Sequence, residues 1–90
     1  MERFPSREIL VKTIIDVMQN NPELTSQEMN KLVSRELKLS ESLLAIENAN
    51  CSGTEFSYRM CWARTLLKQR GVICNPSRGI WRLSSICTMN

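Results

Sequence analysis

A long helical segment that ends at a glycine and runs directly into a short hairpin limits the possible folds most. Residues 54–70 carry apolar side chains at helical spacing, and Gly71 stands where a helix end needs a left-handed residue. Residues 72–74 and 80–83 are rich in β-branched and aromatic side chains, and residues 75–79 (NPSRG) have turn chemistry. A hairpin alone is marginally stable in water, so we expect it to pack on the helices. The candidates for this contact are Val72, Ile80 or Trp81.

Three helical segments precede this unit. The first covers residues 6–20 and ends before Pro22, because proline disfavours helix in the residue that precedes it. The second begins at Thr25, which can form a capping box with Glu28, and continues with apolar residues three and four positions apart. A shorter third segment is expected at residues 40–46, after which a small, polar loop leads into the long helix.

This order of elements predicts an α+β fold that is mostly helical, a winged helix-turn-helix. Three helices would bury their apolar stripes together as a three-helix core, with a short helix in addition and a C-terminal β-hairpin as the wing. A chain of 90 residues is long enough for one core. We therefore expect residues 1–90 to form a single winged-helix domain.

Charge is distributed unevenly between the two halves of the chain. Residues 1–53 contain six basic and eight acidic side chains, a net charge of −2. Residues 54–90 contain six basic side chains against Glu55 alone, a net charge of +5. Such asymmetry indicates a polyanion as the partner of the C-terminal half, and a solvated basic face without a partner is the alternative.

The cysteines and the absence of histidine argue against a metal site. The four cysteines, Cys51, Cys61, Cys74 and Cys87, form no CxxC pair, and the chain has no histidine, so the ligand spacing of structural zinc is missing. Without a secretory signal we expect ordinary thiols, and we expect no cofactor. No apolar run approaches the roughly 20 residues that span a bilayer. An intracellular protein of the cytoplasm, nucleoid or nucleus, with no membrane partner, is the expectation.

The long helix at residues 54–70 has two distinct faces at about 100° per residue. The apolar face consists of Phe56, Met60, Ala63, Leu66 and Leu67. The opposite face consists of Tyr58, Cys61, Thr65, Lys68 and Gln69. Because Trp62 borders the apolar face, we expect it to pack against the core rather than to stack on a base.

Residues 53–83, GTEFSYRMCWARTLLKQRGVICNPSRGIWRL, resemble the N-terminal domain of Mrr-type restriction endonucleases. That domain has an Arg-x-x-Trp-Ala pattern in its long helix, a glycine at the helix end, and a hairpin similar to Pro-x-Arg-Gly-x-Trp-Arg-Leu. The matching residues here are Arg59, Trp62, Ala63, Leu67, Gly71, Pro76, Arg78, Gly79, Trp81 and Leu83. The earlier helices agree in length and pattern, so the resemblance extends over the whole chain.

The resemblance implies a winged-helix module that binds double-stranded DNA in a restriction-modification system. In the family this domain precedes a nuclease domain, whose paired acidic residues and lysine bind the metal and cut the DNA. Asp16 is the only aspartate of this chain. The resemblance therefore implies DNA recognition, by a recognition domain or a small regulator, without cleavage.

On this arrangement residues 54–70 enter the major groove, which admits one helix. The candidate DNA-binding residues are Thr54, Ser57, Tyr58, Arg59, Cys61, Arg64, Thr65, Lys68 and Arg78. Those expected at base edges are Ser57, Tyr58, Cys61 and Thr65. Those expected at the flanking phosphates are Arg64 and Lys68, where cations gain affinity by releasing counterions.

The remaining candidates lie at the start of the long helix and in the wing. The backbone amides that follow Thr54 would hold one phosphate, as helix starts do. Arg78, in the wing tip at residues 75–79, would reach the backbone or the neighbouring minor groove. Arg59 has two roles open to it, contact with DNA or an ion pair with Glu55 four residues earlier.

A protein-interaction module without direct nucleic-acid binding is the alternative function, with Tyr58 and Cys61 in contact with a partner chain. An enzyme is not expected, because the carboxylates are scattered and no cysteine has a base nearby in sequence. The expected partners are double-stranded DNA, a second copy of the chain in a homodimer that reads two half-sites, and a nuclease or regulatory protein.

Overall fold

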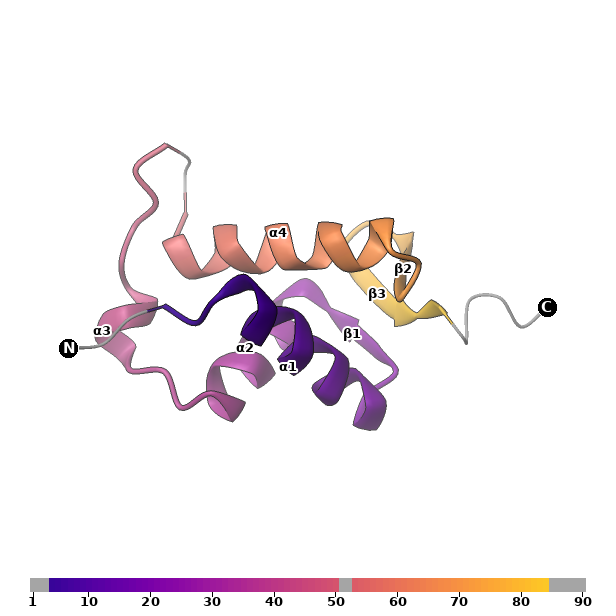
Figure 1. Cartoon of the computed structure of the whole chain (residues 1–90). Helices are drawn as coiled ribbons and strands as arrows, with labels where there is room; N and C mark the ends of the chain where they lie inside the picture. Colours follow the sequence, from indigo (N-terminus) through magenta and orange to yellow (C-terminus); the bar gives the residue numbers. More distant parts are fainter. Residues whose placement is uncertain (1–3, 51–52, 85–90) are drawn as a thin grey trace.

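The computed structural model describes residues 4–50 and 53–84, with four helices and three strands in these ranges. In chain order they are α1 (Arg7–Asn20), β1 (Glu23–Thr25), α2 (Ser26–Glu36), α3 (Glu41–Leu44), α4 (Glu55–Gln69), β2 (Ile73–Ser77) and β3 (Ile80–Leu83). The long helix α4 lies above α1 in the view of Figure 1, and β2 and β3 lie at its C-terminal end.

Each of these helices begins after a hydroxyl side chain. Ser6, Thr25, Ser40 and Thr54 are the N-caps, each accepting a hydrogen bond from the amide three residues on. Thr25 and Glu28 form the predicted capping box. The amide of Glu28 donates to the Thr25 hydroxyl at 3.1 Å, and the amide of Thr25 donates to the Glu28 carboxylate at 3.0 Å. At the other end of α4, Gly71 has a φ of 76° and terminates the helix as predicted.

The short helix α3 is shorter than the predicted segment at residues 40–46. It ends at Leu44, because the chain turns there and the carbonyl of Ile46 accepts a hydrogen bond from the amide of Glu55 at 2.8 Å. Glu47 and Thr54 then form an antiparallel bridge, which closes the described part of the loop before α4.

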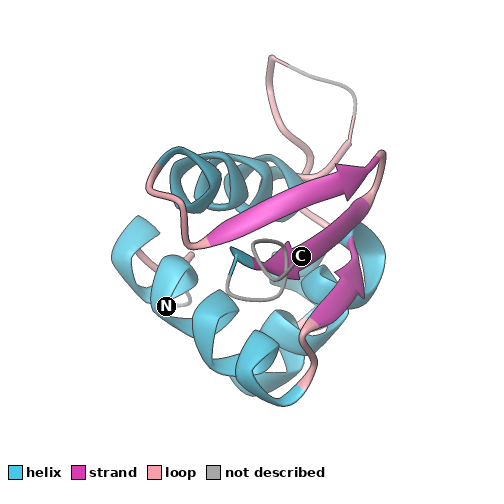
Figure 2. Ribbon diagram, turned by 90° about the vertical axis from the view of Figure 1, so that its right-hand side faces the viewer, coloured by secondary structure: helices cyan, strands magenta, loops and turns pink. Residues whose placement is uncertain are grey.

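The sheet has three strands rather than the predicted two. Figure 2 shows β3 between β1 and β2, and both neighbours run antiparallel to it. Leu24 pairs with Trp81 and is only 5% exposed, and Arg82 forms an ion pair with Glu23. A strand of three residues that leads straight into a capping box carries almost no pattern, so the sequence gives no signal for it. The third strand supplies the support that a lone hairpin lacks.

One core joins the helices to this sheet. Its buried apolar side chains are Leu10, Ile14, Val17, Met18, Leu24, Met29, Val33, Phe56, Met60, Ala63, Leu67 and Ile73. Val72, Trp81 and Leu83 pack against this core as partly buried residues. The most buried residue of the hairpin is Ile73, at 1% exposed, and not one of the three named candidates.

The cysteines differ from expectation at one position. Cys61 is a free, exposed thiol as predicted, whereas Cys74 in β2 is disulfide-bonded, so the prediction of an ordinary thiol is wrong there. The spacing of cysteines along the chain does not show which sulfurs lie close together in the fold. The predictions for Cys51 and Cys87 fall outside the described residues.

These elements confirm the predicted α+β, mostly helical winged helix-turn-helix. The first strand sits between α1 and α2 in sequence and pairs with the last strand, so the wing is anchored to the start of α2. Within the described ranges no helix is long and apolar enough to cross a membrane.

Candidate nucleic-acid interface

The outer face of α4 presents a continuous set of small, polar and aromatic side chains. We use the name outer face for the exposed residues Ser57, Tyr58, Cys61, Thr65 and Lys68. The opposite side of the helix is buried from Phe56 to Leu67. The predicted division of α4 into a core side and a solvent side is therefore correct at these positions, and five candidate residues lie together on one surface.

Two backbone amides at the start of α4 donate hydrogen bonds to groups of the protein itself. The Thr54 hydroxyl accepts from the amide of Ser57 at 3.1 Å and donates to the Ser57 hydroxyl at 3.0 Å, and the amide of Glu55 donates to Ile46. The side chain of Glu55 adds a negative charge at the same place. Thr54 therefore acts as a helix cap, and the phosphate expected at this helix start stays a prediction.

Glu55 and Arg59 form the ion pair that the four-residue spacing predicts. The distance from Arg59 Nε to Glu55 Oε2 is 2.6 Å, and Asn48 Nδ2 donates to Oε1 at 2.7 Å. The hydrogen bond from Arg59, followed by that from Asn48, holds the pKa of Glu55 below its usual value. The Arg59 guanidinium also lies 4.8 Å from the centroid of the Phe4 ring, and its side chain remains partly exposed.

Arg64 is placed differently from the prediction, which put it at the flanking phosphates. The residue is only 7% exposed, because it faces α2 and β3 rather than solvent. Its Nη1 donates to Asn30 Oδ1 at 2.7 Å, and its guanidinium lies 5.7 Å from the centroid of the Trp81 ring. Burial lowers the pKa of Arg64, and its Nε has no hydrogen-bond partner among the described residues. Arg64 therefore connects α4 to α2 and to β3.

Trp62 also differs from its prediction. It is 52% exposed and does not belong to the core, and the Arg7 guanidinium lies 5.9 Å from its ring centroid. Tyr58, one turn earlier, is 40% exposed as expected. Trp62 lies at the border of the apolar face of α4. A helical wheel does not show whether a side chain at such a border is buried or exposed.

The wing is held against the start of α2 by hydrogen bonds. The amide of Ser26 donates to the carbonyl of Gly79 at 3.0 Å, and Trp81 Nε1 donates to the Ser26 hydroxyl at 2.9 Å. Asn75 Nδ2 donates to the carbonyls of Ser77 and Ile80, which closes the tip. Arg78 is exposed at this tip, so the structure gives it the solvent-facing position that the sequence predicts.

The start of α2 is a neighbour of the wing that the sequence did not reveal. Gln27 and Lys31 are exposed on α2, one turn apart, beside Ser26 and Asn30 that bond to the wing and to Arg64. The capping box marked where this helix begins, but only the pairing of β1 with β3 brings that start to the wing. No group of histidine, cysteine, aspartate or glutamate suited to a metal ion occurs within the described ranges.

Comparison with known proteins identifies the family. No curated protein and no solved structure gives a significant match. The family model for the Mrr N-terminal domain matches residues 8–86, which include all of α1 through β3 except Arg7 at the first turn. The chain therefore belongs to the Mrr N-terminal domain family.

Proposed function

We propose that this chain binds double-stranded DNA with α4 in the major groove and the wing on the backbone or in the minor groove. One observation carries the proposal: the outer face of α4 and the wing tip carry Lys68 and Arg78 and no acidic residue. The only carboxylate of α4, Glu55, is bound by Arg59 and Asn48 at the helix start. This surface is therefore cationic, as a partner of the phosphate backbone needs to be.

The proposed roles follow from position on α4. Ser57, Tyr58, Cys61 and Thr65 would contact base edges, because they lie between the helix start and its last turn on the solvent side. Lys68 and Arg78 would contact phosphates. Arg59 is not proposed as a contact, because it pairs with Glu55 and lies on the flank of α4 toward α1. Arg64 is not proposed as a contact; it positions α4 relative to α2 and the wing.

The proposal assigns recognition and not cleavage to this chain. Glu36 and Lys38 have the Glu-x-Lys spacing of the family's nuclease site, with Asp16 upstream. Glu36 is the last residue of α2 and Asp16 lies in α1, and the described residues contain no group of side chains suited to a metal ion, so we assign them no catalytic role. A nuclease or regulatory protein would act beside this module, and a homodimer would present two copies of α4 to two half-sites.

A duplex titration at several salt concentrations tests the proposal. We expect the affinity to fall steeply as salt rises. The double variant Lys68→Ala/Arg78→Ala should make the negative slope of log K against log salt shallower by about 1.8, because each lost phosphate contact removes about 0.9. The matched control, Lys12→Ala/Arg35→Ala, removes two exposed cations outside the proposed interface and should keep the slope. Absence of duplex binding at low salt would refute the proposal.

The second candidate function is protein binding by α4, which the exposed Trp62 and Tyr58 favour. Large exposed aromatic side chains are enriched in protein interfaces. Pull-down experiments with and without nuclease treatment separate the two candidates, because partners bridged by DNA disappear on digestion and direct protein partners do not.

A further inference from the structure

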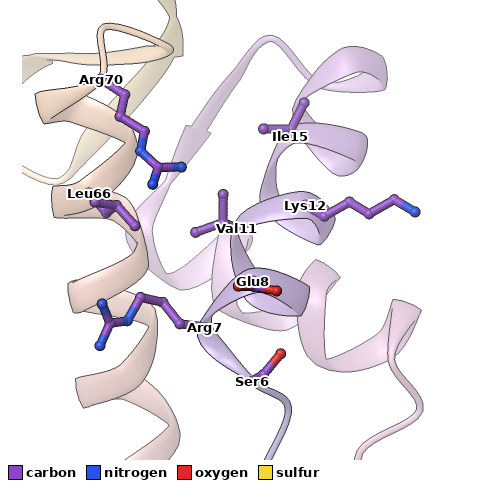
Figure 3. Close-up of a pocket in the computed structure, with 8 residues that line it drawn as sticks. All are labelled: Ser6, Arg7, Glu8, Val11, Lys12, Ile15, Leu66 and Arg70. Atoms are coloured by element: carbon purple, nitrogen blue, oxygen red, sulfur yellow. The ribbon is translucent and has the colours of Figure 1, made fainter.

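A groove between α1 and α4 lies on the flank of the long helix that the proposed DNA contacts do not use. Figure 3 shows side chains from both helices around it, and its volume is about 720 Å³. The residues that matter here are Arg7, Val11, Lys12 and Ile15 from α1 and Leu66 and Arg70 from α4. This volume lies within the roughly 300–1,000 Å³ of concave ligand sites.

The middle of the groove is apolar. Val11 and Ile15 are partly buried against the core, Leu66 is partly buried on α4, and all three line the groove. In Figure 3, Val11 and Leu66 point from opposite helices into the space between α1 and α4. An occupant of this groove therefore gains by placing apolar side chains on these three residues.

The rim of the groove is cationic. Arg7, Lys12 and Arg70 stand around the apolar middle against one acidic residue, Glu8. Figure 3 shows Arg70 and Arg7 near opposite ends of the groove, on the side of α4. Neither salt bridge between described residues involves these three cations, so their charge remains available to an occupant.

The groove and the outer face of α4 point in different directions. Leu66 and Lys68 are two residues apart, which places them about 160° apart around the helix. A molecule in the groove would therefore leave the outer face and the wing accessible. The groove residues of α1 extend from Arg7 to Ile15, a length of about 12 Å or two helical turns.

We propose that this groove binds an acidic amphipathic helix of a partner protein. Apolar side chains three and four residues apart would lie on Val11, Ile15 and Leu66, as in other helix-in-groove complexes. Carboxylates beside them would face Arg7, Lys12 and Arg70. A nucleic-acid backbone satisfies the cations but offers nothing to the apolar middle, which is why a peptide fits this surface better.

The test uses a fluorescent synthetic peptide of about 14 residues, with leucines at helical spacing and glutamates on either side of them. We expect fluorescence anisotropy to show saturable binding, and a peptide of the same composition in scrambled order to bind much more weakly. We expect the double variant Lys12→Glu/Arg70→Glu to weaken the binding by about tenfold or more. The matched control, Lys31→Glu/Arg35→Glu, makes the same change of net charge on α2 and should change the binding less than about twofold.

Mapping by amide chemical shifts on the ¹⁵N-labelled chain keeps the proposal testable even if a variant fails to fold. Shifts at Val11, Ile15 and Leu66 on addition of the peptide support it. Shifts confined to the outer face of α4, equal binding of the scrambled peptide, or displacement of the peptide from the groove by duplex DNA would overturn it. Because the DNA titration uses other residues, failure of this proposal and failure of the proposed function are distinguishable.

Discussion

The two flanks of α4 carry similar side chains and use them differently. On the flank toward α2 and the wing, Arg64 is buried, bonded to Asn30 and stacked near Trp81. On the flank toward α1, Arg59 and Arg70 are exposed, and Trp62 has more than half of its surface in solvent. Arg64 lies against the Trp81 ring on the first flank, and Arg7 lies against the Trp62 ring on the second. Of these two pairs, only Arg64 and Trp81 are packed into the fold.

The difference arises from the strand β1. Because β1 pairs with β3, the wing is pressed against the start of α2, and Ser26, Trp81, Arg64 and Asn30 form one connected polar cluster. Among residues 4–50 and 53–84 no strand covers the other flank, where α1 and α4 leave a groove. The residue types are therefore a poor guide to which flank is structural and which is free to bind a partner.

The largest expected effect is on the stability of the wing-side flank. Leu24→Ala removes a buried side chain of β1, and we expect it to lower the free energy of unfolding by about 2–5 kcal/mol through lost burial and a cavity. Ile9→Ala, on α1 where Ile9 is largely exposed, should change it by less than about 0.5 kcal/mol. Urea unfolding of both variants provides the comparison, and equal losses would contradict the packing described for β1.

Arg64 tests whether the polar cluster is structural. Arg64→Ala leaves Asn30 without its partner and uncovers Trp81, so we expect a loss of about 2–3 kcal/mol in the free energy of unfolding. Arg64→Met keeps most of the packing volume and avoids a buried charge, so it should lose less. On the other flank Arg59→Ala should lose less than Arg64→Ala, because the Arg59 pair is exposed to solvent.

The salt dependence of DNA binding distinguishes a residue that stabilises the fold from one that contacts a phosphate. Lys68→Ala should lower the slope of log K for duplex DNA against log salt by about 0.9, because one phosphate contact is lost. Arg64→Met should lower the affinity, if at all, without a change of slope, because Arg64 lies inside the fold. A change of slope in Arg64→Met similar to that in Lys68→Ala would mean that Arg64 reaches the DNA.

The smallest expected effect concerns acid. The pKa of Glu55 is lower in the folded chain, mainly because Arg59 donates to it, so its interactions stabilise the fold above the ordinary glutamate pKa of about 4.3. That stability is lost as pH falls through the lowered pKa. Glu55→Gln should therefore be less stable than the parent chain at pH 7 and lose less of its stability between about pH 5 and pH 3. Thermal unfolding at these pH values is the measurement, and identical acid sensitivity would contradict the role of this pair.

Local rules predicted the parts of the fold that depend on near neighbours. The Thr25–Glu28 box and the end of α4 at Gly71 each depend on residues a few positions apart, and both are confirmed. The order of the helices and the hairpin followed from hydrophobic spacing. The exposed positions of Tyr58, Cys61 and Thr65 on α4 also followed from the helical period.

The parts that were missed depend on contacts between distant segments. The strand β1 exists because β3, more than 50 residues later, pairs with it, and three residues do not form a readable pattern. The burial of Arg64 needs both Asn30 and Trp81, which lie 34 and 17 residues away along the chain. A cation on a helical wheel is assigned to solvent unless its distant partners are known.

Amide chemical-shift mapping of a short duplex on the ¹⁵N-labelled chain tests the central claim most directly. We expect the largest shifts on the outer face of α4, at Ser57, Cys61, Thr65 and Lys68, and at Arg78 in the wing, and we expect them to fade as salt is raised. Shifts concentrated in the groove between α1 and α4, or no shifts at low salt, would contradict it.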